Sequence, residues 1–417
     1  MTFSRFGERF TRHTGTRELM DDLGAALGGD EPLNMLGGGN PAQIPAMLEL
    51  FRREFARILA DERDFRRLVA DYADPVGEQG FRAALSRLLR DNYGWPVGPE
   101  HVALTAGSQS GFFLLFNLLA GPRADGRAAR ILLPLTPEYV GYQDLGVTDE
   151  ILTSRRPAIE RLPDRQFKYH VDFAAIDMPD DIAAVCVSRP TNPTGNVLTD
   201  DELQRLAAVA RGRDVPLILD SAYGLPFPRI VFTDAMPYWD DNVILCLSLS
   251  KLGLPGVRTG IVVARPEIVA ALGAATATTS LAVGSVGPVL MRELIASGEI
   301  VRASEEVIRP FYRQRSRQAL EWLAASLEGC DYRVHRPEGA FFLWLWLPSL
   351  PITSAELYRR LKARGTFVLS GHHFFPGLAA DWPHRHECLR ISYAQPPEVV
   401  RAGLAAIGEE VRRAFAA

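Results

Sequence analysis

The sequence predicts an α/β protein: a large domain with a doubly wound, mostly parallel mixed sheet flanked by helices, and a smaller α+β domain. Two observations predict this fold. The middle of the chain alternates short apolar, β-rich runs with amphipathic stretches, as in buried strands joined by crossover helices. The chain has 417 residues, which exceeds the length at which one hydrophobic core usually stops growing.

The expected elements follow in chain order. Residues 1–45 hold a glycine-rich turn and little periodic structure, so we expect an N-terminal arm and part of the small domain. The large domain is expected over 46–300, with strands at 102–104, 131–133, 183–188, 215–219, 243–248 and 260–264 and a helix at 202–210. The rest of the small domain is expected over 301–417, with helices at 305–327, 357–364 and 401–417 and strands at 341–347 and 389–393.

Charge and composition exclude several classes of function. The chain has 46 basic and 50 acidic side chains, so no overall positive field attracts nucleic acid or an anionic membrane. Four cysteines without CxxC spacing predict free thiols, and no apolar run approaches the roughly 20 residues of a membrane helix. We therefore expect a cytoplasmic protein that acts on small molecules.

The strongest chemical signal is the segment 248–258, Ser-Leu-Ser-Lys-Leu-Gly-Leu-Pro-Gly-Val-Arg, directly after an apolar run. Lys251 would lie at the carboxyl end of a strand, where open α/β sheets bind ligands. Most basic residues of this chain are arginine, so a solvated charge explains Lys251 poorly, although a surface lysine remains the alternative on this motif alone. Arg258 offers paired donors to a phosphate, and the hydroxyls of Ser248 and Ser250 add further donors.

Three further polar clusters follow predicted strands. They are Asp220 and Tyr223 after 215–219, Asn192 in the Asn-Pro-Thr-Gly turn after 183–188, and Gly107, Ser108 and Gln109 where an apolar helix begins after 102–104. Backbone N–H groups at such a helix start bind phosphate. Each cluster alone has an ordinary alternative: a capping carboxylate, a plain turn and a common helix start.

Taken in order over nearly the whole chain, these clusters resemble the fold-type I pyridoxal-phosphate (PLP) enzymes, and specifically the class I and II aminotransferases. The resemblance implies pyridoxal 5'-phosphate held as a Schiff base by Lys251, with Asp220 at its ring nitrogen and Tyr139 stacked on its ring. It implies that Arg390 binds the substrate carboxylate. The other implied cofactor contacts are Gly107, Ser108, Gln109, Asn192, Tyr223, Ser248, Ser250 and Arg258, and the other implied substrate contacts are Gly39 and Asn192.

The resemblance also implies a homodimer with shared active sites. Tyr72 matches a tyrosine that in this family reaches the phosphate of the neighbouring subunit. Gly38 and Gly39 match a turn that lies over the substrate carboxylate. Here the turn reads Gly-Gly-Gly-Asn-Pro, which departs from the commonest pattern and leaves open which N–H faces the substrate.

Segments outside the cofactor motifs sharpen the resemblance to the valine–pyruvate aminotransferases. Among them are 167–173, 337–346 and 371–377. This implies that L-valine and pyruvate give 3-methyl-2-oxobutanoate and L-alanine, and that amino acids and 2-oxo acids are the partners. Because one methylene is worth only about 1–3 kcal/mol in a pocket, we expect other small aliphatic amino acids to react too. Leu19, Met20, Tyr139 and Phe374 are candidate walls of that pocket.

Other functions fit parts of the sequence. The same scaffold could carry an aminotransferase for another substrate, a lyase or a decarboxylase, and the cofactor motifs do not decide between them. Residues 37–42 match a GxGxxA dinucleotide fingerprint, but Pro41 intrudes before a helix can begin. A DNA-linked sensor is disfavoured because no basic recognition helix precedes residue 30. Four histidines lie close together in the sequence: His372, His373, His384 and His386. They lack the helical spacing of a zinc enzyme, so no metal is expected.

Overall fold

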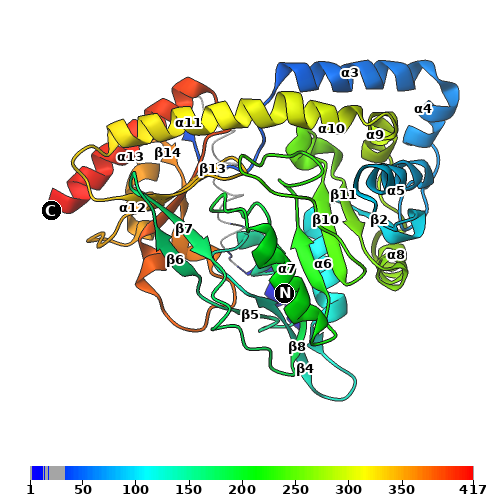
Figure 1. The fold of residues 1–417 in the computed structure, drawn as a ribbon, viewed down its shortest axis with the longest axis horizontal. Coiled ribbons are helices and arrows are strands. Elements are labelled where there is room, and N and C mark those ends of the chain that lie inside the picture. The colour runs from blue at the N-terminus through cyan, green and yellow to red at the C-terminus, as the bar shows by residue number, and fades with distance from the viewer. Residues whose placement is uncertain (1, 13, 15–16, 18–32, 417) are drawn as a thin grey trace.

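The computed structural model describes residues 2–12, 14, 17 and 33–416 (Figure 1). An eight-stranded sheet forms the centre of the larger part of the molecule, in the order β2-β11-β10-β9-β8-β4-β3, with β5 paired to β4. The strands are β2 (Val102–Thr105), β3 (Gly121–Pro122), β4 (Ala128–Leu133), β5 (Leu152–Ser154), β8 (Ile182–Ser188), β9 (Leu217–Asp220), β10 (Val243–Ser248) and β11 (Gly260–Val263). All six strands expected in the large domain are present.

The direction of the strands confirms the predicted α/β class. β10, β9, β8, β4 and β5 run parallel to one another, whereas β11 is antiparallel to both β10 and β2, and β3 is antiparallel to β4. Every residue of β2, β8, β9, β10 and β11 is buried. Burial on both faces explains why these strands read as continuous apolar runs rather than as alternating patterns.

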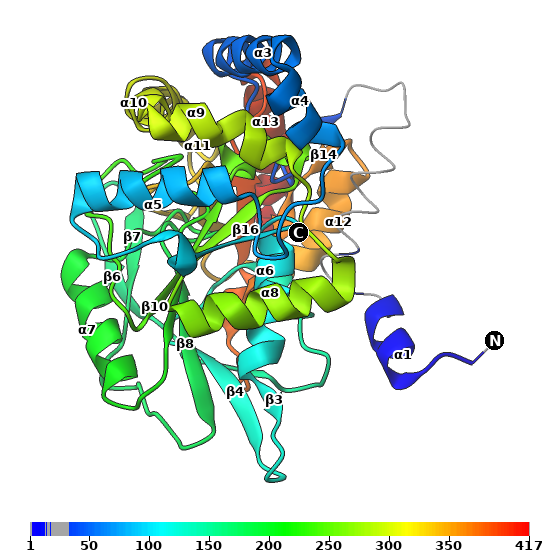
Figure 2. The ribbon, with the colours of Figure 1, turned by 90° about the vertical axis from the view of Figure 1, so that its right-hand side faces the viewer.

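Helices cover this sheet. α6 (Ser108–Leu119) follows β2, α7 (Asp200–Arg211) packs on β8 and β9, and α5 (Gln79–Tyr93) and α8 (Pro266–Ser280) pack near β2 (Figure 2). α7 contains the predicted helix 202–210 and begins with a capping box between Thr199 and Glu202. α3 (Pro45–Ala60), α4 (Glu62–Val69) and α9 (Val286–Ala296) pack together beside α5.

A second sheet has six strands in the order β15-β16-β13-β12-β7-β6. Its strands are β6 (Ala158–Arg161), β7 (Gln166–His170), β12 (Arg333–His335), β13 (Phe342–Trp346), β15 (Leu369–Ser370) and β16 (Cys388–Ser392). β13 and β16 correspond to the two strands expected after residue 300. The hairpin β6–β7 comes from the middle of the chain and joins this sheet through the parallel pairing of β7 with β12.

α11 (Arg309–Ser326) and α12 (Ser354–Lys362) pack on the second sheet, and α13 (Pro397–Ala416) packs on both of these helices. α11 and α13 confirm the helices expected near 305–327 and 401–417. The expected 305–327 helix is interrupted, because α10 (Glu299–Ala303) passes into α11 through a π-helical turn at Ser304–Ile308. In Figure 1 this run extends from the α9 side of the molecule across to the second sheet.

The chain before residue 45 contributes short elements. β1 (Asn34–Met35) pairs in parallel with β14 (Thr366–Phe367), so this segment lies with the second sheet. α1 (Arg5–Thr11) lies farther out, with Arg9 bonded to the backbone of Gly146. No helix within 2–12 or 33–416 is long and apolar enough to cross a membrane.

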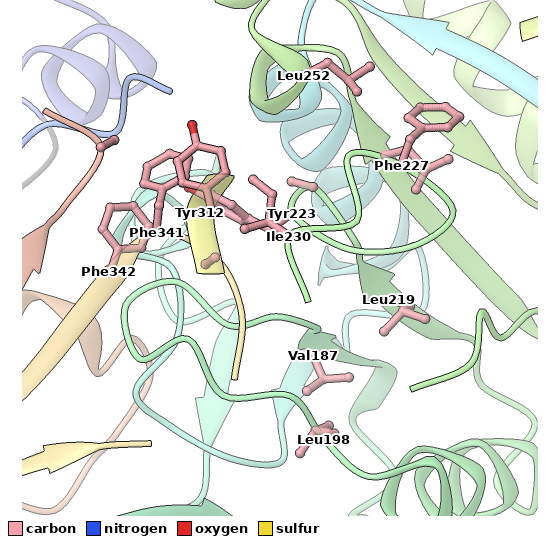
Figure 3. Packing of buried hydrophobic residues seen from close by; sticks show 14 of the residues in the cluster. Val187, Leu198, Leu219, Tyr223, Phe227, Ile230, Leu252, Tyr312, Phe341 and Phe342 are labelled. Carbon is pink, nitrogen blue, oxygen red and sulfur yellow. The ribbon is translucent and has the colours of Figure 1, made fainter. Parts of the chain in front are cut away.

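An aromatic group connects the two parts of the core. Tyr312 of α11 stacks on Phe341 with centroids 5.3 Å apart, and Tyr223, which follows β9, meets Phe341 at 5.2 Å. Figure 3 shows these rings together with Phe342 at one side of the buried cluster. The packing fixes Tyr223 at the junction between the two sheets.

Candidate active site

A cavity of about 350 Å³ lies where β8, β9 and β10 end. Residues at the carboxyl ends of these strands line it, as expected for a ligand site in an open α/β sheet. The predicted site residues on its wall are Gly39, Ser108, Gln109, Tyr139, Asn192, Asp220, Tyr223, Ser248, Ser250, Lys251, Arg258 and Arg390. The fold therefore brings together residues that the sequence spreads over 350 positions.

Lys251 lies in a short 3-10 turn, Ser250–Leu252, directly after β10. Its Nζ donates a hydrogen bond of 2.7 Å to the carbonyl of Gly39 and lies 5.2 Å from the ring centroid of Tyr223. Burial, together with the nearby positive charges of Arg390 and Arg258, lowers the pKa of Lys251 to about 8, against the opposing effect of the Asp220 carboxylate. The amine is therefore suited to lose and regain a proton near neutral pH.

Asp220 is the last residue of β9 and is buried at the floor of the cavity. The hydroxyl of Tyr142 donates to its Oδ2 at 2.6 Å, and the N–H of Ala222 donates to its Oδ1 at 2.9 Å. Burial raises the pKa of Asp220, while these two donors and the charge of Lys251 lower it. The donors support a carboxylate that can pair with a cationic ring nitrogen.

One corner of the cavity is built for an anion. Gly107, with φ of +89°, precedes α6, so the free N–H groups of Ser108 and Gln109 begin a twelve-residue helix. A Cβ on Gly107 would lie 2.3 Å from Nη2 of Arg258, so any other residue here would displace that guanidinium. Nη1 of Arg258 lies 3.5 Å from the hydroxyl of Ser250, and no carboxylate of the described residues pairs with it. A cation, helix N–H groups and hydroxyls together fit a phosphate.

Arg390 of β16 enters the cavity from the second sheet and is only 2% exposed. Its Nη1 donates to Oδ1 of Asn192 at 2.8 Å and its Nη2 donates to the carbonyl of Gly37. Its Nε has no partner among the described residues, and its guanidinium lies 4.2 Å from the ring centroid of Phe342. Burial lowers the pKa of Arg390 to about 10. A buried guanidinium without a carboxylate partner fits a carboxylate ligand.

The cavity wall includes residues that were not predicted as site residues: Asn40, Phe112, Val140, Ser188, Pro190 and Ala222. Tyr142 and Glu138, which are not on the wall but contact predicted site residues, were also not predicted. Tyr142 ends a 3-10 turn, Val140–Tyr142, and its ring meets that of Tyr139 edge-on with centroids 5.4 Å apart. Glu138 is fully buried and accepts hydrogen bonds from the N–H of Ser188 at 2.8 Å and of Tyr139 at 3.2 Å. Burial raises the pKa of Glu138 to about 8. The signals were a carboxylate inside an apolar run and a second tyrosine three residues after Tyr139.

Some predicted residues lie elsewhere. Tyr72 is 87% exposed and is not on the wall of this cavity, so its role at a neighbouring subunit stays a prediction. Phe374 is fully buried against Trp344 and Arg390 rather than on the cavity wall. Leu19 and Met20 lie outside the described residues. Of the two candidate pocket walls that the structure describes, Tyr139 lines the cavity and Phe374 does not.

The two rival motifs have structural roles. β1 spans two residues and the next helix, α3, begins at Pro45, so no helix start follows the glycines of 37–39 as a dinucleotide fingerprint requires. His372 shares a hydrogen bond of 2.7 Å with Ser370, and His384 contacts the hydroxyl of Tyr169. Across the ranges that the structure describes, no group of three or more His, Cys, Asp or Glu residues is arranged to hold a metal ion.

Comparison with known proteins agrees with this geometry. The family model for aminotransferase class I and II matches residues 35–407. The valine–pyruvate aminotransferase of Escherichia coli (strain K12) is 48% identical over 416 residues, which cover 100% of this chain and 99% of that protein.

Solved structures give the same result for the fold. The crystal structure of valine–pyruvate aminotransferase from Salmonella typhimurium LT2 has a TM-score of 0.88 and 45% identity, covering 96% of this chain and 99% of that one. The structure of the aspartate aminotransferase of Thermus thermophilus with maleate has a TM-score of 0.78 and 22% identity, covering 98% of this chain and 100% of that one. At this identity the similarity supports the fold and nothing further. The chain belongs to the class I and II aminotransferases.

Proposed function

We propose that this enzyme uses PLP to transfer the amino group of L-valine to pyruvate, giving 3-methyl-2-oxobutanoate and L-alanine. The observation that carries the proposal is the cavity in which Lys251, Asp220, Arg258 and Arg390 converge. Identity of 48% over the full chain to a valine–pyruvate aminotransferase supports the choice of substrates. A lyase or decarboxylase on the same scaffold is disfavoured by that relationship.

The residues present fit PLP. Lys251 would hold its aldehyde carbon, Asp220 would pair with its ring nitrogen, and Tyr139 would lie against its ring. Asn192 and Tyr223 would donate to its phenolate oxygen. The phosphate would be held by Arg258, by the start of α6 and by nearby hydroxyls; these residues are Gly107, Ser108, Gln109, Ser248 and Ser250.

When bound, PLP supplies an electron-withdrawing ring that acidifies the Cα–H bond of the attached amino acid. Lys251 Nζ takes the proton from Cα and later returns a proton, acting as general base and then as general acid. Its lowered pKa, about 8, suits both roles near neutral pH. Arg390 holds the α-carboxylate by paired hydrogen bonds, so that Cα–H faces Lys251, and Gly39 adjoins that carboxylate.

The charges of the cavity favour an uncharged substrate side chain. Among the described residues its cations are Lys251, Arg258 and Arg390. Lys251 is the reacting amine, Arg258 is assigned to the phosphate and Arg390 to the α-carboxylate, so none of these cations remains to bind a carboxylate on the substrate side chain. Phe112, Val140 and other apolar residues on the wall fit an aliphatic group.

We propose a homodimer in which Tyr72 reaches the phosphate site of the partner subunit. An 87% exposed tyrosine close to Val69, itself 62% exposed, is consistent with a surface that another subunit covers. K251A and Y72F subunits would each be impaired alone. Mixing them would restore activity, because one site of each mixed dimer would have both residues intact; no restoration would contradict sharing of the sites.

The domain division is also a proposal: an arm and part of the small domain over 1–45, the large domain over 46–300 and the rest of the small domain over 301–417. In this division the β6–β7 hairpin would reach from the large domain into the second sheet. We further propose a cytoplasmic enzyme, because its four cysteines are free thiols in the structure.

The test is a coupled assay with PLP-loaded protein, L-valine and pyruvate, in which alanine and 3-methyl-2-oxobutanoate are both quantified. Equal amounts of the two products are expected, with parallel lines in a double-reciprocal plot, as ping-pong transfer requires. Turnover of L-aspartate or L-phenylalanine without turnover of L-valine would keep the class of reaction and reject the substrate.

A further inference from the structure

Lysine is rare in this chain, with three residues among the 46 basic side chains: Lys168, Lys251 and Lys362. Lys362 is exposed on α12, and Lys251 lies in the cavity. Lys168 lies on β7 and is only 5% exposed. Where almost every other cation is arginine, a buried lysine calls for a reason that is specific to the ammonium group.

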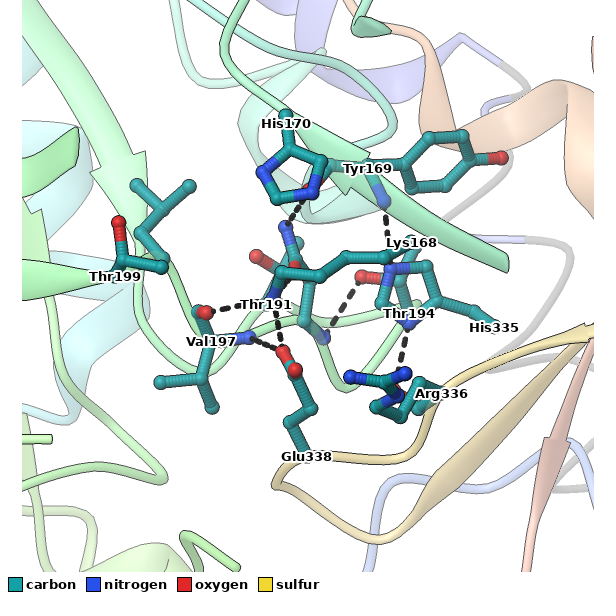
Figure 4. A network of polar contacts seen from close by, with 12 residues as sticks. Lys168, Tyr169, His170, Thr191, Thr194, Val197, Thr199, His335, Arg336 and Glu338 are labelled. Atoms are coloured by element: carbon teal, nitrogen blue, oxygen red, sulfur yellow. Dashed lines mark hydrogen bonds and ion pairs between the residues drawn. The ribbon is translucent and has the colours of Figure 1, made fainter. Parts of the chain in front are cut away.

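The contacts of Lys168 supply that reason. Its Nζ donates to Oδ1 of Asn196 at 2.9 Å, to the carbonyl of Val197 at 3.0 Å and to the carboxylate of Glu338 (Figure 4). An ammonium has three N–H donors, and all three are used. A planar guanidinium, with five donors in a fixed fork, does not match three acceptors that surround one nitrogen. Glu338, which is 7% exposed, also accepts from the N–H of Val197 at 3.1 Å.

Two of the three acceptors, on Asn196 and Val197, belong to the turn at 191–197, which follows β8. Within this turn the N–H of Thr191 donates to the carbonyl of Asn196 at 2.8 Å, and the N–H of Gly195 donates to the carbonyl of Thr191 at 2.8 Å. The N–H of Glu338 donates to the carbonyl of Gly195 at 3.2 Å. Gly195 has φ of +70°, and a Cβ there would lie 2.6 Å from the carbonyl oxygen of Gly339. The turn is thus a closed unit pressed against the 338–339 segment.

The same turn carries Asn192, whose Oδ1 accepts the hydrogen bond from Arg390. Arg390 and Lys168 both come from the second sheet, on β16 and β7. The turn therefore has two contacts with this part of the molecule. Arg390 binds Asn192 at the cavity, and Lys168, paired with Glu338, binds Asn196 and Val197 away from the cavity. A buried ion pair adds little stability over an apolar pair of similar volume, so its contribution here is to geometry.

We propose that Lys168 and Glu338 are positioning residues for the carboxylate site, holding the 191–197 turn so that Asn192 orients Arg390 toward the substrate. The inference deepens the proposed function and rests on it for the identity of the substrate. Neither residue touches the cavity, so neither is catalytic. Its consequence is that carboxylate recognition depends on the buried pair more strongly than PLP binding, to which the turn contributes Asn192 alone among the assigned contacts.

The test compares K168M, K168R, E338Q and K168M/E338L with wild type. E410Q is the matched control, because Glu410 is a buried glutamate whose side chain is 7% exposed and is paired with Arg364 far along α13. The probe is 3-methylbutanoate, which presents the carboxylate and aliphatic group of valine without the reacting amine. Its inhibition constant and the Kd for PLP are measured for each holoenzyme.

We expect the inhibition constant to rise about 10- to 100-fold in K168M, E338Q and K168M/E338L, since displacement of a binding group by about 1 Å has effects of that size. K168R should not restore binding. The Kd for PLP should rise less than the inhibition constant, because Asn192 is one cofactor contact among several and Lys251, Asp220 and Arg258 lie outside the 191–197 turn. E410Q should match wild type in both. The double variant guards against misfolding, because an apolar pair leaves no unpaired buried charge. An unchanged inhibition constant in a folded double variant would overturn the proposal.

Amide hydrogen exchange supplies a readout that does not depend on the substrate. The amides of Thr191 and Gly195 should exchange faster in K168M/E338L and stay as protected as in wild type in E410Q. Equal protection in all three proteins would overturn the inference. If wild type turns over another amino acid but not L-valine, the proposed substrate fails, and the carboxylate analogue of that amino acid replaces 3-methylbutanoate in the same comparison.

Discussion

Replacement of Gly107 by alanine tests the proposed phosphate corner. The new Cβ would lie 2.3 Å from Nη2 and 2.9 Å from Cζ of Arg258, so the guanidinium must move by about 1 Å to regain ordinary contact. A charge-assisted hydrogen bond contributes about 1.5–3 kcal/mol, so its loss should raise the Kd for PLP about 10- to 150-fold. Titration of the apoenzyme with PLP, followed by absorbance, measures this Kd.

The same substitution also strains the backbone, because Gly107 has φ of +89°. With ψ of 156°, Gly107 lies in a region of backbone conformation that is almost restricted to glycine, so alanine there costs about 1–3 kcal/mol, which must be separated from the effect on Arg258. G94A is the control: Gly94 has φ of +68°, and its Cβ would meet nothing within 4 Å. Gly94 is in the left-handed α conformation, so we expect both variants to lose unfolding free energy, G107A at least as much as G94A, and only G107A to lose affinity for PLP. Equal affinity in G107A and G94A would refute the proposed role of this corner.

Two further substitutions test other parts of the site. R390K should raise the KM for L-valine about 10- to 100-fold with little change in the Kd for PLP, because lysine cannot form the paired hydrogen bonds to a carboxylate. Kinetics over a range of valine concentrations measure this KM, and an unchanged value would contradict the assignment. Y142F removes a hydrogen-bond donor that lowers the pKa of Asp220, so this pKa should rise. The acidic limb of the plot of kcat against pH should then move to higher pH. A plot identical to that of wild type would show that Tyr142 does not lower the pKa of Asp220.

Local patterns in the sequence predicted most of the large sheet and most of the cavity. β8, β9 and β10 are buried on both faces, so each appears as an apolar run, and a predicted site residue ends or follows each run: Asn192 follows β8, Asp220 ends β9 and Ser248 ends β10. Because parallel strands end at one edge of the sheet, the sequence order of these residues was enough to predict that they meet.

Features that depend on contacts between distant segments could not be predicted. β6 and β7 join the second sheet because β7 pairs with β12, more than 160 residues later, and no local pattern carries that pairing. The hydrogen bond of Tyr142 to Asp220 likewise spans 78 positions. Lys168 lay inside a segment that indicated the subfamily, but its burial against Glu338 depends on the packing of three separate segments.

The central claim is that Lys251 binds the cofactor, and the scarcity of lysine allows a direct measurement. Reduction of the PLP-loaded enzyme with borohydride makes the link between lysine and cofactor permanent, and peptide mass spectrometry then locates it among Lys168, Lys251 and Lys362. The account predicts one modified lysine per chain, at Lys251, and no modification in K251A. Modification of Lys168 or Lys362 instead, or an unmodified wild-type chain that still turns over L-valine, would contradict it.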